Sequence, residues 1–344
     1  MSVFRDAACG DDVGINHIWR PDMRPRLSLP ALAAAMIATG TVALPIQASA
    51  TTEPSSQTAS PGVYRMTLGA FTIIALSDGS FDLPTDQLLI EPRPGEVKEL
   101  LDRAGLPAAV PTAINAFLID TGTKRILVDA GSGALLGPSL GKLLDNLRAA
   151  GYRPEQIDEL LLTHLHPDHV GGLADGGRMT FPNAVIRVDR SEAGFWLDKA
   201  NRSRVDDSVK GSFDAALTSL QPYIAAGRLK QFEPGEKLEP GIMAVAMPGH
   251  TAGHTVYRIE SRGQTMMMWG DIVHVAAVQF PDPRITIHFD SVTGEAEAAR
   301  ETAFGDATRK GYWVAASHIA FPGIGHVGSD GTGYMWKPAD RNAR

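Results

Sequence analysis

Cysteine is nearly absent from this sequence of 344 residues, which contains only Cys9. The rest of the chain therefore offers no disulfide and no thiolate that could bind a metal. Aromatic residues are also scarce, at 7%, and basic residues are fewer than acidic ones, 32 against 39, for a formal net charge of −7. Without an excess of positive charge, we expect no nucleic-acid partner and no attraction to an anionic membrane surface.

The longest hydrophobic run lies near the N-terminus, at residues 27–46. Arg24 and Arg26 precede it, and the segment Gln-Ala-Ser-Ala follows it and ends at Ala50. This order is typical of a secretory signal peptide, whereas a membrane anchor would be less interrupted and flanked by basic residues. We predict an N-terminal extension and signal peptide at residues 1–50, with Met23 as an alternative start. The mature protein is then periplasmic or secreted, with no membrane partner.

After the signal segment, we predict a flexible arm at residues 51–62, rich in Ser, Thr and Pro, and one domain at residues 63–344. The spacing of apolar residues predicts short strands interspersed with helices in two similar halves. The expected strands span residues 71–76, 116–120, 125–129, 185–188, 242–247, 255–259, 266–269 and 312–316. The expected helices span residues 139–150, 208–226 and 291–309. Such halves favour two sheets face to face, with helices on both outer sides.

One short segment carries four residues of the types that bind metals. The apolar residues 160–162 run directly into His164, His166, Asp168 and His169. On an extended chain His164 and His166 point to the same side, because side chains alternate with period two. So many polar side chains after a buried strand would be costly without a cation. The segment therefore predicts a metal site, and four ligands exceed what one metal usually takes from a single loop.

The pattern HxHxDH resembles the signature of the metallo-β-lactamase superfamily. Further residues match the ligand set of that family in order: His250 in Pro-Gly-His-Thr, Asp271 in Trp-Gly-Asp, and His318 in Ala-Ser-His. The resemblance implies an αββα sandwich of two mixed β-sheets. It also implies one metal held by His164, His166 and His250, a second held by Asp168, His169 and His318, and a bridge at Asp271.

The resemblance implies two divalent metal ions. Nitrogen and oxygen ligands favour zinc but would also accept manganese, cobalt or iron. Two ions about 3.5–4 Å apart can hold a water whose pKa falls to roughly 7, so we expect a metal-bound hydroxide beside the bridging Asp271 as the nucleophile. We expect His254 to support a ligand from outside the coordination sphere, with a role as an eighth ligand as the alternative. Asp78 and Asp129 are expected to fix turns near the site.

Longer stretches are similar to the methyl parathion hydrolase branch of this superfamily, which is secreted and degrades organophosphates. The similar stretches are residues 151–158, 163–173, 181–185, 195–197, 274–280 and 315–326, within a resemblance that covers residues 65–340. The resemblance implies a homodimer that hydrolyses phosphotriesters with an aryl leaving group. Three alternatives remain: a lactonase, including an acyl-homoserine lactonase, with promiscuous phosphotriesterase activity; a thioester hydrolase of the same fold; and a non-hydrolytic metal-binding or redox module.

The branch lines its leaving-group pocket with aromatic rings, and Trp196 and Phe213 fall at matching positions. Phe289 is a further candidate, and core packing is the alternative interpretation for all three. Leu136 stands where the branch has a phenylalanine, and His274 stands where it has a leucine. We expect Leu136 and His274 on the pocket wall, with a place outside the pocket as the alternative.

Overall fold

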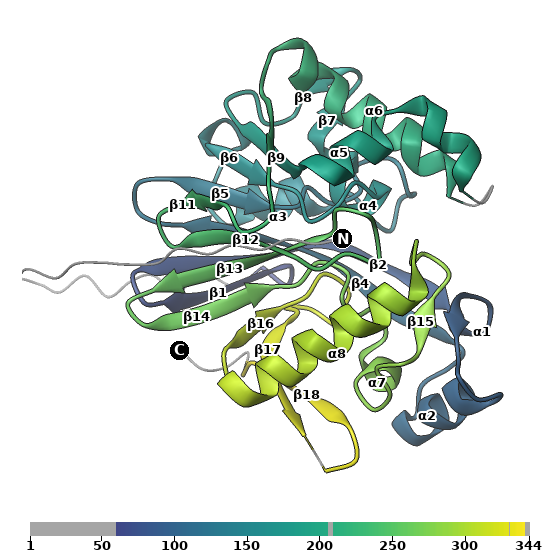
Figure 1. The fold of residues 1–344 in the computed structure, drawn as a ribbon. Coiled ribbons are helices and arrows are strands. Elements are labelled where there is room, and N and C mark those ends of the chain that lie inside the picture. Colours follow the sequence, from purple (N-terminus) through teal and green to yellow (C-terminus); the bar gives the residue numbers. More distant parts are fainter. Residues whose placement is uncertain (1–59, 206–208, 330, 341–344) are drawn as a thin grey trace, which may run out of the picture. The chain divides into compact units, whose positions relative to one another are not determined.

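The computed structural model describes residues 60–205, 209–329 and 331–340, so the predicted signal peptide lies outside the described residues. Two seven-stranded sheets lie face to face (Figure 1). The strands of the first sheet lie in the order β1 (Val63–Leu68), β2 (Phe71–Pro84), β4 (Ala109–Asp120), β5 (Arg125–Val128), β6 (Glu159–Leu161), β9 (Val185–Asp189) and β10 (Leu229–Phe232). Those of the second lie in the order β11 (Lys237–Glu239), β12 (Ile242–Ala246), β13 (Thr255–Ser261), β14 (Gln264–Met268), β16 (Trp313–Ala315), β17 (Ile324–Ser329) and β18 (Tyr334–Pro338).

The core between the sheets follows from the two-residue period of the strands. Ile73 and Ala75 of β2 are buried in one cluster with Tyr257 and Met268 of the second sheet. Ile74, between the first two, belongs to a different cluster on the other face of the same strand. Alternate side chains of β2 thus enter separate apolar layers, so both faces of the first sheet are covered.

Helices cover the outer face of each sheet. The cluster beyond the first sheet includes buried residues of α3 (Leu143–Ala149), α5 (Arg190–Trp196) and α6 (Lys210–Ala225). Beyond the second sheet, Phe304 of α8 (Thr293–Lys310) stacks on Trp269, with ring centroids 5.5 Å apart. Figure 1 shows α5 and α6 on one side of the two sheets and α8 on the other. The αββα architecture predicted from the sequence is confirmed.

A smaller apolar cluster lies beside the sandwich, under α2 (Glu96–Ala104) and α7 (Ala276–Gln279). It includes two short strands that pair with each other, β3 (Leu89–Ile90) and β15 (Thr286–Ile287). These strands bring two segments that are far apart in the sequence to the same side of the domain. The short helix α1 (Thr85–Leu88) precedes β3.

The predicted helix at residues 139–150 begins later in the structure, at Leu143. The residues before it form a loop that is held by the buried carboxylate of Asp78, which accepts from the backbone N–H groups of Ser132, Gly141 and Leu143. These hydrogen bonds compete with a helical start. Asp78 thus fixes a turn, as the sequence suggested.

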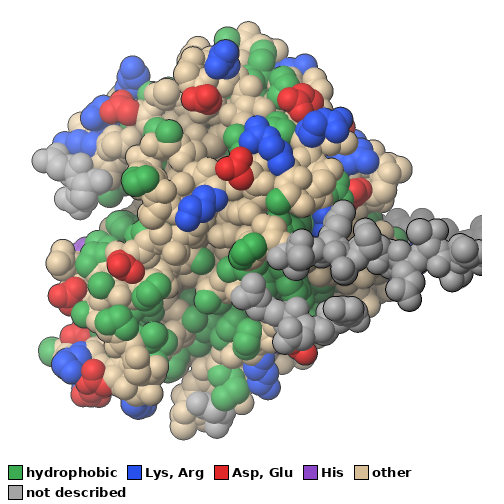
Figure 2. All heavy atoms as spheres, turned by 180° about the vertical axis from the view of Figure 1, so that it is seen from behind, with side chains coloured by type: hydrophobic (Ala, Val, Ile, Leu, Met, Phe, Trp, Pro, Cys, Tyr) green, Lys and Arg blue, Asp and Glu red, His purple; other side chains and the backbone are tan. Residues whose placement is uncertain are grey.

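The surface in Figure 2 carries basic and acidic side chains interspersed, and hydrophobic side chains gather between them. Several basic residues are paired with acids, for example Arg190 with Glu233 and Arg202 with Asp214. No helix within the described ranges is both long and apolar enough to cross a membrane.

Candidate metal centre

The candidate ligands of the first sheet follow its strand β6, which lies between β5 and β9. His164 and His166 lie in the extended segment after this strand, and Asp168 and His169 lie on the short helix α4 (Pro167–Val170). Pro167 stands at the first position of that helix, where its missing N–H costs nothing. Gly172 follows, and a side chain there would overlap the carbonyl oxygen of Ala130. The glycine allows the segment after the ligands to pass close to the loop after β5, which carries Asp129.

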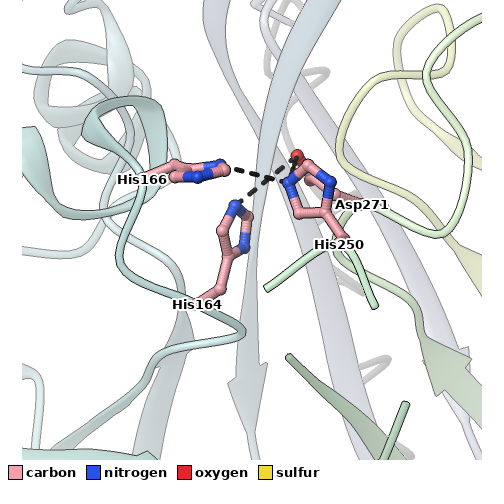
Figure 3. Close-up of side chains that lie close together, drawn as sticks. All are labelled: His164, His166, His250 and Asp271. Carbon is pink, nitrogen blue, oxygen red and sulfur yellow. Dashed lines mark hydrogen bonds and ion pairs between the residues drawn. The ribbon is translucent and has the colours of Figure 1, made fainter. Parts of the chain in front are cut away.

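The second sheet supplies the other three candidates from loops that follow its strands. His250 follows β12, Asp271 follows β14 and His318 follows β16. The sandwich brings all seven residues together in two groups that share Asp271, with the ligand atoms of each group within 4.8 Å of one another. Figure 3 shows the side chains of one group, His164, His166, His250 and Asp271, pointing toward one another. The second group contains Asp168, His169, Asp271 and His318.

The carboxylate of Asp271 lies at the centre of both groups. Its Oδ2 atom lies 3.6 Å from His164 Nε2, 3.3 Å from His250 Nε2 and 3.0 Å from His318 Nε2. Its Oδ1 atom lies 3.1 Å from His169 Nε2. One carboxylate therefore faces imidazoles of both groups, which is the arrangement expected of a bridging ligand.

The hydrogen bonding of the cluster fits bound cations. His164 Nε2, His169 Nε2 and Asp271 Oδ1 are buried and have no hydrogen-bond partner among the described residues. Unpartnered buried polar atoms are costly and rare. Three of them aimed into one cluster of nitrogen and carboxylate-oxygen donors indicate ligands rather than packing residues, and this donor set suits divalent zinc, manganese, cobalt or iron.

The opposite ring nitrogens of the histidines are fixed by other groups. His169 Nδ1 lies 2.8 Å from Asp129 Oδ2, His250 Nδ1 lies 2.8 Å from Asp290 Oδ1, and His318 Nδ1 lies 3.0 Å from the carbonyl oxygen of Ala113. Donation through Nδ1–H leaves Nε2 as the lone-pair atom that can bind a metal. Asp129 also accepts from the backbone N–H and the hydroxyl group of Thr163, so it ties the segments after β5 and β6 together, whereas the sequence predicted that it would fix a turn.

The electrostatics of the cluster are those of an ionised acid among histidines. Burial, aided by His250, lowers the pKa of His166 to about 3. Burial also acts against a charged His250, but hydrogen bonds with Asp271 and Asp290 outweigh it and raise the pKa of His250 to about 9. Although buried, Asp271 keeps a pKa well below its ordinary range because His318 and His169 lie beside it. A metal ion binding here takes the place of such protons.

His254 does not belong to either group of candidate ligands. Its Nδ1 donates to the carbonyl oxygen of Met247, and its Nε2 accepts from the backbone N–H of Asp271. Both hydrogen bonds are 3.0 Å long. Burial lowers the pKa of His254 to about 3, so this neutral pattern of one donor and one acceptor is stable. His254 thus holds the backbone of Asp271.

A cavity of 370 Å³ opens at the candidate ligands. The described residues that line it are Phe81, Leu83, Thr112, Leu136, Leu140, His166, Pro167, Asp168, Val209, Ser212, Asp271, His274, Phe289 and His318. Three of the predicted pocket residues, Leu136, His274 and Phe289, are among them. None of these lining residues is a lysine or arginine.

His274 is a buried imidazole on the wall of this cavity. Neither ring nitrogen has a hydrogen-bond partner among the described residues, although Nε2 lies 3.3 Å from Asp271 Oδ2. Burial outweighs the attraction of Asp271 and lowers the pKa of His274 to about 4. The ring is therefore neutral at pH 7, with hydrogen-bonding capacity left for a ligand.

Trp196 and Phe213 lie elsewhere. Both are fully buried in the cluster outside the first sheet, with ring centroids 4.7 Å apart, and neither lines the cavity. This corrects their predicted place on the pocket wall, because α5 and α6 turn these rings into the core. Trp196 instead packs edge-on against His166, with ring centroids 5.3 Å apart.

Two buried acids near the cluster were not predicted from the sequence: Asp290, beside His250, and Glu192 of α5. Neither lies in a spaced motif with the ligands, so no local signal marks them.

A different pattern, GxSxG at residues 137–141, is typical of serine hydrolases when it joins a strand to a helix. Here it lies in an irregular loop, and Ser139 is exposed. This loop therefore lacks the geometry of a serine nucleophile.

Comparisons with known proteins agree with this site. The profile of the metallo-beta-lactamase superfamily matches residues 109–318. The crystal structure of AbOPH, a hydrolase of the beta-lactamase superfamily, superposes with a TM-score of 0.78 at 36% identity, covering 82% of this chain and 99% of that one. AidC, a dizinc quorum-quenching lactonase in complex with the product N-hexanoyl-L-homoserine, superposes with a TM-score of 0.75 at 26% identity, covering 81% of this chain and 98% of that one.

Similarity to curated sequences is more partial. A ribonuclease of Thermus thermophilus is 26% identical over 183 residues, which are 53% of this chain and 40% of that protein. The chain spans about half the length of the curated relatives it matches.

Proposed function

Because this chain belongs to the metallo-β-lactamase superfamily, we propose that it is a dinuclear metal hydrolase that acts on neutral, activated esters, both lactones and aryl phosphotriesters. The observation that carries the proposal is the pair of ligand groups that share Asp271 and open into a mostly apolar cavity. The similarity to AbOPH, a hydrolase, and to AidC, a dizinc lactonase, supports metal-dependent hydrolysis, and the substrate class is inferred from the cavity.

The proposed ligands are those of the two groups. One ion would be held by His164, His166 and His250, and the other by Asp168, His169 and His318. Asp271 would bind both ions. When bound, two divalent ions supply an activated water and a Lewis acid. The protein's part is to hold the seven ligands, exclude bulk water and orient the ester. Zinc is the proposed metal, and the similar structure of AidC is described as dizinc.

The walls of the cavity support a neutral substrate. Apolar surface comes from Phe81, Leu83, Leu136, Leu140 and Phe289. The described lining contains no lysine or arginine, so an anionic group distant from the metals would have no cationic side chain to pair with. This disfavours the thioester hydrolase, whose carrier would bring negative charge.

Among neutral esters, we propose that lactones are hydrolysed faster than phosphotriesters. Two predicted rings, Trp196 and Phe213, lie in the core and cannot stack on an aryl leaving group. His274, with unpartnered nitrogens, offers hydrogen bonds that suit a polar lactone. The deciding measurement compares kcat/KM for methyl parathion, an aryl lactone and an acyl-homoserine lactone on one purified sample. Turnover of none of these esters would contradict the proposal.

The lining residues Leu136 and His274 are expected to limit phosphotriester hydrolysis. Leu136→Phe adds a ring, and a ring pair contributes roughly 0.5–1.5 kcal/mol, or up to about tenfold in rate. His274→Leu removes a polar group from the apolar wall. Each variant should raise kcat/KM for methyl parathion severalfold and change aryl-lactone hydrolysis less.

Leu135→Phe is the matched control for Leu136→Phe. Leu135 and Leu136 are both 46% exposed, but only Leu136 lines the cavity. If Leu135→Phe and Leu136→Phe changed kcat/KM equally, Leu136 would not determine specificity. The same conclusion would hold for Leu136 or His274 if its variant changed kcat/KM equally for both substrates.

The support that His254 gives to Asp271 predicts a moderate loss. His254→Ala removes the acceptor for the backbone N–H of Asp271, and loss of such outer partners typically costs roughly 10–100-fold in metal affinity or activity. His326→Ala is the control, since His326 likewise bonds a backbone carbonyl through Nδ1, that of Tyr312, but belongs to neither ligand group. Equal losses in both variants, measured as bound metal after dialysis, would contradict the role of His254.

Export and dimer formation are further proposals. The signal-peptide pattern at residues 1–50 supports periplasmic or secreted localisation, and the resemblance to secreted organophosphate hydrolases supports a homodimer. Mass spectrometry of the N-terminus of the mature protein tests cleavage after Ala50, and light scattering of the purified protein tests the oligomeric state.

A further inference from the structure

Helix α5 carries a buried acid whose two oxygens bond to two different ligand-bearing loops. Glu192 Oε1 accepts from the backbone N–H of Leu165, which lies between the ligands His164 and His166. Glu192 Oε2 accepts from the backbone N–H of Gly253, in the loop of His250 and His254. Both hydrogen bonds are 2.9 Å long. The two loops come from different sheets, so Glu192 joins the two halves of the domain.

The surroundings of Glu192 give it no other function. Its side chain is fully buried, and no lysine or arginine pairs with it among the described ion pairs. Burial raises the pKa of Glu192, and the two backbone donors oppose this rise. The packing is also tight, because a side chain on Gly253 would overlap the backbone of Glu192. A buried carboxylate is costly, and this one makes hydrogen bonds only where they set the spacing of the loops.

The histidines nearest to these two bonds belong to one of the two ligand groups. The loops that Glu192 joins carry His164, His166 and His250, which are the three histidines of the first group. The second group is supported elsewhere, His169 by Asp129 and His318 by the carbonyl oxygen of Ala113. Trp196, one turn further along α5, packs against His166 and adds a second contact to the first group.

We propose that Glu192 is a positioning residue for the first metal position alone, holding the His164–His166 segment and the His250 loop at the separation that one ion requires. The proposal rests on the dinuclear centre proposed above. It predicts that changes at Glu192 weaken one of two bound ions and leave the other unaltered.

The test is a Zn²⁺ titration of the chelated full-length protein in competition with a chromophoric chelator. The wild type should bind two ions. Glu192→Ala should bind one ion with wild-type affinity and a second roughly 10–100-fold more weakly, the usual cost of an outer hydrogen-bond partner. Glu192→Gln, which retains one acceptor oxygen and the shape of the side chain, should give a smaller loss at the same ion. This conservative variant keeps the test valid if alanine prevents folding.

Asp189→Asn is the matched control. Asp189 is a buried acid next to the same helix, and its carboxylate accepts from the backbone N–H groups of Ser191 and Glu192. Among the described residues its carboxylate bonds to neither ligand loop, so the variant should lower the Tm of the metal-free protein while both ions bind as in the wild type. A merely structural role of Glu192 would give this same result for Glu192→Gln.

Single-site backgrounds assign the affected ion. In a His318→Ala background, which leaves the first group intact, adding Glu192→Gln should weaken the remaining ion. In a His164→Ala background, adding Glu192→Gln should leave the affinity for the remaining ion unchanged. Equal weakening of both ions, or of neither, would overturn the proposal for Glu192. A wild type that binds fewer than two ions would instead contradict the dinuclear centre itself.

Discussion

Replacing Asp271 with asparagine is expected to lower hydrolysis by more than about 100-fold and to reduce bound metal at both positions. Outer partners of ligands already cost roughly 10–100-fold, and Asp271 is a proposed ligand in both groups. Asparagine keeps the shape but loses the negative charge and one ligand oxygen. Nitrogen atoms of four candidate ligand histidines lie within 3.6 Å of this carboxylate, so the change removes the charge that both groups share.

The control for this variant is Asp282→Asn. Asp282 is also buried, but its carboxylate pairs with Arg284 and belongs to neither ligand group. The Asp282→Asn variant should retain two ions per chain and nearly full activity. If Asp271→Asn loses metal from one position only, the bridging role is wrong and Asp271 serves a single ion. A loss smaller than that of His254→Ala would mean that the ligand assignment is wrong.

Removal of metal is expected to abolish hydrolysis completely, and each active chain should contain two divalent ions. Seven residues converge in two groups, and three of their buried atoms have no hydrogen-bond partner in the part of the chain that the structure describes. Ions that bind the folded state alone also stabilise it, by RT ln(1 + [L]/Kd), so chelation should lower the Tm. Elemental analysis of purified protein, with activity and Tm measured before chelation, after it and after adding Zn²⁺ back, checks each part.

The same experiment has two outcomes that would count against the centre. Full activity in a sample with one ion per chain would show that the second group is not needed for the reaction. Full activity after complete chelation would exclude metal-dependent hydrolysis. Recovery on adding Zn²⁺ separates loss of metal from irreversible unfolding.

Much of the metal centre could be read from local patterns. His164, His166, Asp168 and His169 lie within six consecutive positions after an apolar strand, and period-two alternation is enough to place the first two on one side. His250, Asp271 and His318 each follow an apolar run, and strand ends in a two-sheet sandwich meet at one edge. The αββα architecture was predicted mainly from the resemblance that this motif carries, and the alternation and helical spacing of short segments agreed with it.

The sequence alone could not determine which rings face the cavity or which residues support the ligands. Trp196 and Phe213 occupy helices whose burial depends on the neighbouring sheet, and the structure turns both into the core. Glu192 bonds to the backbone of Leu165, 27 positions away, and Asp290 bonds to the ligand His250, 40 positions away, so both contacts exist only in the folded domain. The ligand pattern is therefore a property of the sequence, because it depends on spacing within single strands and turns. Pocket shape and ligand support are properties of the tertiary structure, because they depend on which distant segments come into contact.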